Sequence, residues 1–341
     1  MSEPSATETL RDTLPQARPA APVGLTARLV DLLLRRLGAR IRRGSLTVEL
    51  PDGRRHHFRG EGEESAVWQL HSVRALARVI TGGAMGLAES YLDGEWTSPD
   101  LTRLLLLLGA NEDRAGNSIE GIPVLRWLNR AWHGLHANTR RQSRRNIAYH
   151  YDLGNAFYGA WLDPSMTYSA ALFAEPVDPA EPLERAQIRK YAHLGALIGL
   201  APGQDVLEIG CGWGGFAEYA AGLGAQVHGI SLSREQVVWA QSRLARAGLA
   251  ERTRIELRDY RDLDRRYDRI ASIEMFEAVG ERYWPQYAET LARSLSPDGI
   301  AGLQIITIDA QRFESYRRRP DFIQRHVFPG GMLPTEDVLA R

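Results

Sequence analysis

The chain has 341 residues, one cysteine, and equal numbers of basic and acidic residues, with 42 Lys and Arg against 42 Asp and Glu. This length is enough for two domains, and fractions of 44% hydrophobic and 25% charged residues exclude wholesale disorder. The lone Cys211 excludes an internal disulfide and gives no support for a cysteine-based zinc site.

Residues 1–23 are rich in Pro, Ala, Ser and Thr and lack the apolar core of a signal peptide, so they are expected to form a disordered tail. No stretch of the chain approaches the ~18–20 apolar residues that a membrane-spanning helix needs. We therefore expect a cytoplasmic protein that associates peripherally with the inner face of the cell membrane.

Two segments carry most of the unbalanced positive charge. Residues 24–43 contain six arginines and one acid with apolar residues at helical spacing, and residues 123–146 contain six arginines and no acid, with Trp127 and Trp132 between them. Such basic amphipathic helices suit an anionic membrane surface. The alternative is that each helix packs on its own domain with its arginines in water.

Residues 24–108 predict a small α+β domain. Alternation over 45–50 before Pro51-Asp52-Gly53 indicates a strand and a turn, and helices are predicted at 67–80, 87–92 and 101–108, with a break at Gly82-Gly83. His56 and His57 are typical of an exposed polar strand, so no metal site is predicted. Residues 109–147 are expected to hold a linker and the second basic helix.

From residue 148 to 341 apolar strands alternate with helices. Strands are predicted at 205–209, 226–230, 254–257, 269–273 and 300–308, and helices at 216–223, 234–247 and 284–295. This alternation predicts an α/β fold with a doubly wound, mostly parallel sheet covered by helices on both faces.

The motif that carries chemistry is Val-Leu-Glu-Ile-Gly-Cys-Gly-Trp-Gly-Gly at residues 206–215, between a strand and a helix. Its glycines let the backbone turn tightly next to a ligand. An acid, Glu208, precedes the first glycine and suits a cationic amino-acid ligand such as S-adenosylmethionine. A dinucleotide site or a purely structural turn is the alternative.

Further motifs resemble those of the cyclopropane-fatty-acyl-phospholipid synthase family. They are Tyr-His-Tyr-Asp-Leu-Gly-Asn at 149–155, Trp-Leu-Asp-Pro-Ser-Met-Thr-Tyr-Ser at 161–169, and matching stretches at 86–96, 229–236, 259–262, 275–280 and 328–334. The resemblance implies a class I, Rossmann-like S-adenosylmethionine methyltransferase that adds a methylene bridge to the double bond of phospholipid acyl chains.

The resemblance also implies roles for individual residues. The expected cofactor contacts, including those of the glycine loop, are Tyr168, Ser169, Glu208, Gly210, Gly212, Gly214, Ser231, Gln236, Asp259 and Tyr260. The expected catalytic residues are Glu277, Tyr168, Gln304 and His150, with Glu277 helping to hold a bicarbonate ion as general base. The aromatic faces of Tyr168 and Phe276 are expected to stabilise a carbocation.

The chain departs from the family where that bicarbonate would bind. Ala170 and Ala278 stand where the family has a cysteine and a histidine, and Gln304 replaces a second histidine. Bicarbonate is then held more weakly, or the proton leaves by another route. Loss of a different proton would give a methylene- or methyl-branched chain in place of a ring.

The family continues past residues 333–335 with further strands and an active-site tyrosine, so a shortened sheet with an exposed edge strand is expected, which favours association into a homodimer. The expected partners are unsaturated phospholipids at an anionic membrane surface, with no nucleic acid. Two alternatives remain: methylation of a small-molecule acceptor, and a non-catalytic relative that has lost part of the site.

Overall fold

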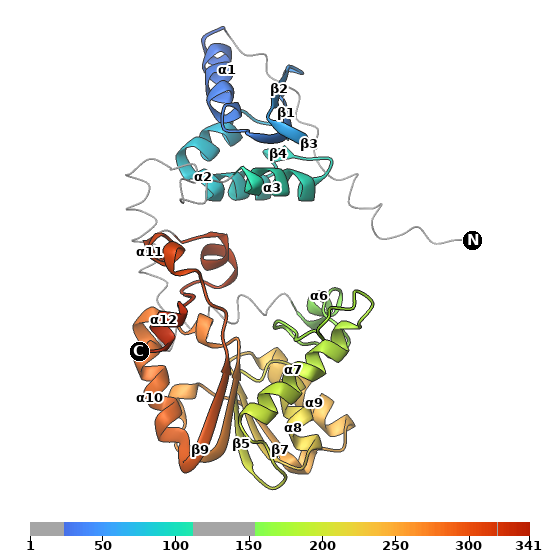
Figure 1. Ribbon diagram of the computed structural model, residues 1–341, viewed down its shortest axis with the longest axis vertical. Coiled ribbons are helices and arrows are strands. Elements are labelled where there is room, and N and C mark those ends of the chain that lie inside the picture. Colours follow the sequence, from blue (N-terminus) through green and yellow to red (C-terminus); the bar gives the residue numbers. More distant parts are fainter. Residues whose placement is uncertain (1–23, 112–153, 319) are drawn as a thin grey trace, which may run out of the picture. The chain divides into compact units, whose positions relative to one another are not determined.

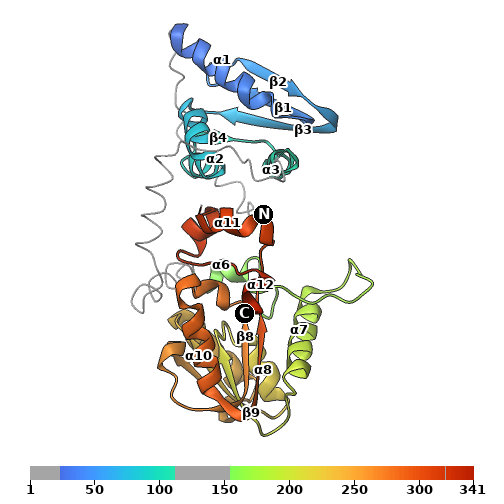
Figure 2. The same cartoon turned by 60° about the vertical axis from the view of Figure 1, so that its left-hand side comes forward.

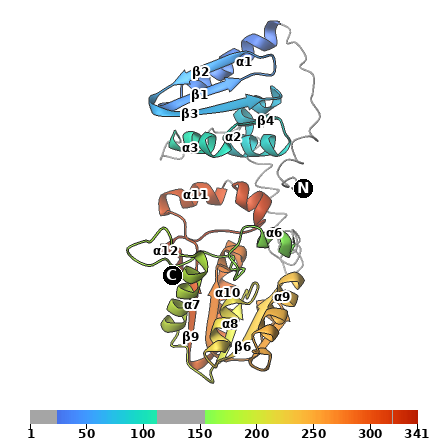
Figure 3. The same ribbon diagram turned by 90° about the vertical axis from the view of Figure 1, so that its right-hand side faces the viewer.

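The fold is taken from a computed structural model that describes residues 24–111, 154–318 and 320–341. The chain divides into two compact units, Met1–Leu128 and Asn129–Arg341, which are treated separately (Figures 1 to 3). The predicted tail, most of the predicted linker, the second basic segment and His150 lie outside the described residues. No helix in the described part of the chain is long and apolar enough to cross a membrane.

The N-terminal unit has a four-stranded sheet in the order β2-β1-β3-β4. Its elements are α1 (Gly24–Gly38), β1 (Arg43–Glu49), β2 (Arg55–Arg59), β3 (Glu61–Leu70), α2 (Arg74–Leu92), β4 (Trp96–Thr97) and α3 (Leu101–Ala110). β1 pairs antiparallel with β2 and parallel with β3. One face of this sheet and the three helices enclose an apolar core that includes Leu34, Trp68 and Leu104.

The helix predicted at 67–80 is wrong over its first part. Residues 67–70 belong to β3, where the buried residues Ala66, Trp68 and Leu70 alternate with partly exposed ones. A period of two favours a strand, and the partner strand β1 satisfies its backbone hydrogen bonds. The break predicted at Gly82-Gly83 is a kink within α2, where Gly83 has φ 62° and ψ −138°.

The first basic segment forms α1, and its apolar side packs on its own unit as far as its side chains are described. Val30 and Leu34 are buried in the core of the N-terminal unit, whereas Arg35 and Arg36 are exposed. The apolar stripe of this helix therefore stabilises its own unit.

The second unit contains a five-stranded sheet in the order β7-β6-β5-β8-β9, parallel throughout. Its strands are β5 (Asp205–Ile209), β6 (Gln226–Ser231), β7 (Thr253–Leu257), β8 (Tyr267–Ile273) and β9 (Leu295–Gln304). Its α-helices are α6 (Asn155–Gly159), α7 (Leu183–Leu197), α8 (Gly215–Gly222), α9 (Arg234–Arg246), α10 (Trp284–Ser294), α11 (Ala310–Arg318) and α12 (Glu336–Leu339).

Helices cover both faces of this sheet, as predicted for a doubly wound α/β fold (Figure 1). Residues of α7, α8 and α9 pack on one face, and Trp284 and Tyr287 of α10 pack on the other. Four predicted strands are confirmed to within two residues. The fifth was predicted at 300–308, but β9 ends at Gln304 because the Ile306 N–H donates to the Glu277 carboxylate and not to a neighbouring strand.

Candidate active site

A cavity of about 740 Å³ opens at the carboxyl ends of β5, β6 and β8. Its size is within the range of about 300–1,000 Å³ that is typical of ligand pockets. The order of the sheet reverses at β5, and ligands of open α/β sheets bind at such a switch point. The glycine loop forms one wall, the segment 166–173 another, and residues around Phe328 a third.

The glycine loop follows β5 directly. Gly210 has φ 81° and Gly212 has φ 52°, backbone angles that a side chain disfavours. The N–H groups of Gly210 and Cys211 both donate to the carbonyl of Ile230, which fixes the turn against β6. The backbone therefore reaches the cavity with no side chain on either glycine.

Glu208 is a buried acid on the central strand β5 and contributes to the cavity wall. Burial raises the pKa of Glu208 to about 8, against the opposing effects of the Ala217 N–H and of nearby positive charges. Its Oε2 atom has no hydrogen-bond partner among the described residues. A buried carboxylate oxygen without a donor fits a ligand that brings its own positive charge.

Lys190 of α7 holds the segment that carries Tyr168 and Ser169. Its ammonium donates to Ser169 Oγ at 2.6 Å, and Gln187 Nε2 donates to the carbonyl of Ser169 at 2.8 Å. Burial lowers the pKa of Lys190 to about 8, although nearby carboxylates, Glu274 first among them, oppose this shift. Two residues of one helix thus fix this wall of the cavity.

Aromatic rings form the wall around Tyr168. Its ring centroid lies 5.6 Å from that of Trp161 and 6.5 Å from that of Phe328. Burial, and then the charge of Glu274, raise the pKa of Tyr168, so the phenol stays neutral. The faces of such rings attract cations, which suits both a sulfonium group and a carbocation.

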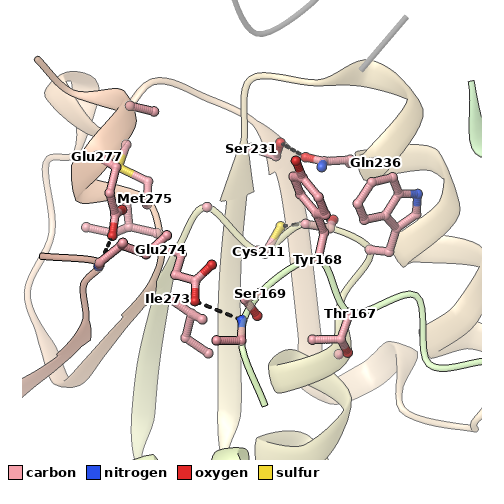
Figure 4. A pocket seen from close by; sticks show the side chains of 18 of the residues that line it. Thr167, Tyr168, Ser169, Cys211, Ser231, Gln236, Ile273, Glu274, Met275 and Glu277 are labelled. Carbon is pink, nitrogen blue, oxygen red and sulfur yellow. Dashed lines mark hydrogen bonds between the residues drawn. The ribbon is translucent and has the colours of Figure 1, made fainter. Parts of the chain in front are cut away.

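Two carboxylates stand on the segment after β8 (Figure 4). Glu274 Oε1 accepts hydrogen bonds from the Ala170 N–H at 2.8 Å and from Gln304 Nε2 at 2.7 Å. Glu277 accepts from the Ile306 N–H. Burial raises the pKa of Glu277 to about 7, and the charge of Glu274 adds to this effect.

Most of the residues predicted for the site lie together in this cavity. Those that line it are Tyr168, Ser169, Glu208, Gly210, Gly212, Ser231, Gln236, Tyr260 and Glu277. Ser231 Oγ donates to Gln236 Oε1 at 2.8 Å, which joins the end of β6 to the first turn of α9.

Gly214, Asp259, Gln304 and Phe276 do not line the cavity as expected. Gly214, with φ 84°, caps α8, and a Cβ there would lie 3.0 Å from that of Ala240. Asp259 binds Arg261 in a buried ion pair at 2.6 Å. Gln304 does not reach the cavity but donates a hydrogen bond from Nε2 to Glu274 Oε1 at 2.7 Å.

Phe276 belongs to the core on the α10 side of the sheet, where it stacks on Trp284 with ring centroids 5.3 Å apart. Its face is therefore not available to a cation in the cavity. Of the two rings predicted to stabilise a carbocation, Tyr168 lines the cavity and Phe276 does not.

The sequence interpretation missed Lys190 and Glu274. Lys190 is the only lysine of the chain, and no motif of the sequence marks it as a site residue. Glu274 stands three residues before Glu277 and directly after a predicted strand, at the sheet edge where ligands bind. Only tertiary contacts show that the two side chains meet at one loop.

The described part of the chain holds no group of three or more His, Cys, Asp or Glu side chains placed to bind a metal ion.

The parallel sheet, the glycine loop at its carboxyl edge and the buried acid define a class I S-adenosylmethionine methyltransferase. The model of the mycolic acid cyclopropane synthetase family matches residues 138–341, well over half of the sequence. The chain belongs to this family, whose cofactor is S-adenosylmethionine, and the unpartnered oxygen of Glu208 fits a cofactor with a cationic amino-acid end.

Two curated relatives illustrate the range of the family. Tuberculostearic acid methyltransferase UfaA1 of Mycobacterium tuberculosis is 41% identical over 277 residues, which cover 79% of this chain and 64% of the relative. Cyclopropane-fatty-acyl-phospholipid synthase of Escherichia coli is 34% identical over 267 residues, which cover 77% and 66%. The chain thus spans about two thirds or less of the length of these relatives.

Among solved structures, mycolic acid cyclopropane synthase CmaA1 complexed with SAH and CTAB aligns with a TM-score of 0.52 and 31% identity. This alignment covers 57% of the present chain and 71% of the synthase. The cyclopropane synthase MmaA2 from Mycobacterium tuberculosis also aligns with a TM-score of 0.52, at 29% identity.

Proposed function

We propose that this protein transfers a one-carbon unit from S-adenosylmethionine to the double bond of unsaturated phospholipid acyl chains, forming cyclopropane fatty acids. The observation that carries the proposal is that one cavity joins a site for a cationic cofactor to an apolar entrance. The names of the two curated relatives, a tuberculostearic acid methyltransferase and a cyclopropane-fatty-acyl-phospholipid synthase, support a lipid acceptor.

The apolar entrance is formed by large hydrophobic side chains that line the cavity and remain exposed. They are Trp161, Phe173, Leu183, Ile306 and Ile323, with exposed fractions between 40% and 51%. Exposed apolar residues that gather at a pocket are typical of a site for an apolar ligand. An acyl chain would bury these side chains, whereas a small polar acceptor would leave them in water.

Within this site the residues of the chain have separate tasks. Glu208 and the glycine loop bind the cofactor, which supplies an electrophilic methyl group when bound. The Tyr168 ring stabilises positive charge, and the apolar walls keep water away from an alkene, which is a weak nucleophile.

A methylene-branched chain is the second candidate product. Ala170, Ala278 and Gln304 replace a cysteine and two histidines of the family, and this change at the proton-accepting site supports loss of the proton by another route. Both the ring and the methylene branch add CH₂ to the acyl chain. Fragmentation in mass spectrometry separates them, whereas a saturated methyl branch differs in hydrogen count.

The test is incubation of the purified protein with methyl-labelled S-adenosylmethionine and vesicles of unsaturated phosphatidylglycerol, followed by mass spectrometry of the extracted acyl chains. We expect label in the unsaturated chains and none in vesicles of saturated lipid. Label in a soluble acceptor with none in lipid would instead support a small-molecule methyltransferase. Cofactor binding without any label transfer would support a non-catalytic relative.

Peripheral association with the inner face of the cell membrane, and hence a cytoplasmic location, is part of the same proposal. The exposed Arg35 and Arg36 of α1 and the basic segment 123–146 support it, since each arginine near an anionic surface contributes on the order of 1 kcal/mol. Vesicle sedimentation of the Arg35→Gln/Arg36→Gln variant, with exposed Arg266→Gln as control, tests this docking. The homodimer remains a prediction, which sedimentation velocity of the purified protein tests.

A further inference from the structure

Glu274 lines the cavity and has no task in the reaction described so far for Glu208, the glycine loop and Tyr168. It follows β8 directly and has φ 48°, in the left-handed region that glycine adopts without strain. A residue with a Cβ in this region is strained by on the order of 1 kcal/mol, and such residues gather at functional sites. A glutamate at a position that suits glycine indicates that its side chain is needed.

Glu274 is held at three points, two on its carboxylate and one on its backbone. Its Oε1 accepts from the Ala170 N–H at 2.8 Å and from Gln304 Nε2 at 2.7 Å, and its own backbone N–H donates to the Gln304 carbonyl at 2.8 Å. Both side-chain hydrogen bonds fall on Oε1, and no donor among the described residues reaches Oε2. One oxygen is thus fixed, and the other keeps its lone pairs for a proton.

These contacts use the donors that an external anion would need. The bicarbonate implied by the resemblance would bind near Ala170, Gln304 and Glu277, but the Ala170 N–H and the Gln304 amide already bind Glu274. A second anion there would be repelled by the Glu274 carboxylate, and Lys190, the cation that acts on this carboxylate, already donates to Ser169 Oγ. The residues present therefore do not fit bicarbonate at this point.

We propose that Glu274 is the catalytic base of this protein, a carboxylate of the chain in the place of an external bicarbonate ion. The inference rests on the proposed function, because it assigns the base of that reaction. It holds for the ring and for the methylene product alike.

The electrons balance without a further reagent. The π pair of the alkene forms a bond to the donated methyl carbon, the sulfur keeps the pair of the broken C–S bond, and the other alkene carbon becomes cationic. Glu274 Oε2 takes one proton from the new methyl group. The released C–H pair closes the ring or, after a 1,2-hydride shift, forms the double bond of a methylene branch.

The other titratable groups at this wall are less suited to accept the proton. Glu277 Oε1 accepts from the Ile306 N–H, and its Oε2 atom is buried, so a substrate in the cavity does not contact it. Glu274 Oε2 also lacks a donor among the described residues but is not buried in this way. Tyr168 is a neutral phenol, and Lys190 is bound to Ser169 Oγ.

The test compares wild type, Glu274→Gln, Glu274→Ala and, as control, Glu251→Gln, an exposed acid on the 3-10 helix Ala250–Arg252. In buffer freed of carbon dioxide, wild type and control should transfer label to lipid at an unchanged rate. Glu274→Gln should lose about 100-fold or more of that rate, the lower range of a general base. Its affinity for S-adenosylhomocysteine should stay within about threefold, which shows that the cofactor site remains folded.

A second readout does not depend on turnover. Line broadening of ¹³C-bicarbonate in NMR should be absent for wild type and present for Glu274→Ala, and added bicarbonate should restore part of the activity of that variant. Binding of bicarbonate by wild type, or a wild-type rate that requires it, would overturn the assignment. A Glu274→Gln rate within about threefold of wild type would overturn it as well.

Failure of this proposal is distinguishable from failure of the proposed function. If wild type transfers no label to any lipid, the function itself is wrong and the assignment of a base falls with it. If wild type and Glu274→Gln transfer label equally, only the assignment falls.

Discussion

The two units of the chain differ in what their cores contain. In the N-terminal unit Ser90 is the one fully buried polar side chain among those described, and it pairs with Trp96 Nε1 at 3.0 Å. The second unit buries Lys190, Glu208 and the Asp259–Arg261 pair. Burial of apolar surface stabilises a fold, whereas burial of a charge opposes folding unless a partner compensates it.

The contrast separates residues that stabilise a core from residues that line the cavity. The core of the N-terminal unit is stabilised mainly by apolar packing, together with the buried hydrogen bond between Trp96 and Ser90. Burial of the acid Glu208 and of Lys190 beside the cavity opposes folding, and Lys190 holds the segment of Ser169 that lines the cavity. Four changes test this contrast.

The largest expected effect is from Leu104→Ala in α3. Leu104 is fully buried, and truncation of a buried leucine costs about 2–5 kcal/mol. Hydrogen exchange should become faster throughout β1, β3 and α3, while the affinity of the protein for S-adenosylhomocysteine stays unchanged. Loss of that affinity would show that cofactor binding by the second unit depends on the stability of the N-terminal unit.

Glu208→Gln should have the opposite profile. We expect affinity for S-adenosylmethionine to fall about 100-fold, close to 3 kcal/mol, because the positive charge of the cofactor favours the ionised form of Glu208, which glutamine lacks. Calorimetric titration measures this loss. Glu218→Gln, a change to a partly exposed acid of α8 that does not line the cavity, is the matched control and should stay within a few fold.

The same residue predicts a pH dependence of stability. The pKa of Glu208 is raised to about 8 in the fold, so between its unfolded value and pH 8 the native state holds a proton that the unfolded state has lost. Stability should therefore fall as pH rises through this window, by at most about 1.4 kcal/mol per pH unit from this group. The pKa of Lys190 is lowered to about 8, so this residue changes the pH dependence of stability only above pH 8, where it makes stability rise with pH.

The predicted fall of stability with pH is checked by measuring the unfolding free energy of wild type and Glu208→Gln between pH 5.5 and 7.5. Hydrogen exchange of β5 and α8 reports this free energy. The stability of the variant should rise relative to that of wild type as pH increases. Parallel curves would contradict the raised pKa.

The smallest expected effect is from Trp161→Ser at the entrance of the cavity. Trp161 is 51% exposed, so its loss should leave the fold intact but reduce label transfer to vesicles about tenfold, or near 1.4 kcal/mol. Leu197→Ser is the control, since Leu197 is 63% exposed at the end of α7 and does not line the cavity. Equal activity of both variants would argue against an acyl chain at this entrance.

Much of the second unit was predictable because its signals are local. The strand and glycine pattern of residues 205–215 places an acid, a tight turn and a helix start in one short stretch, and the structure shows all three. The N-terminal unit was less predictable. Residues 67–70 carry an apolar pattern that suits a short helix or a strand, and only pairing with β1 decides between them.

The sequence by itself predicted the class of fold, the cofactor loop and the family. These features depend on backbone turns and periodic burial within short segments. Folding alone decided that Gln304 and the Ala170 N–H bind Glu274. The reason is physical: which donor a carboxylate meets depends on contacts across more than 100 positions of the chain, as between Ala170 and Glu274, and no local spacing encodes them.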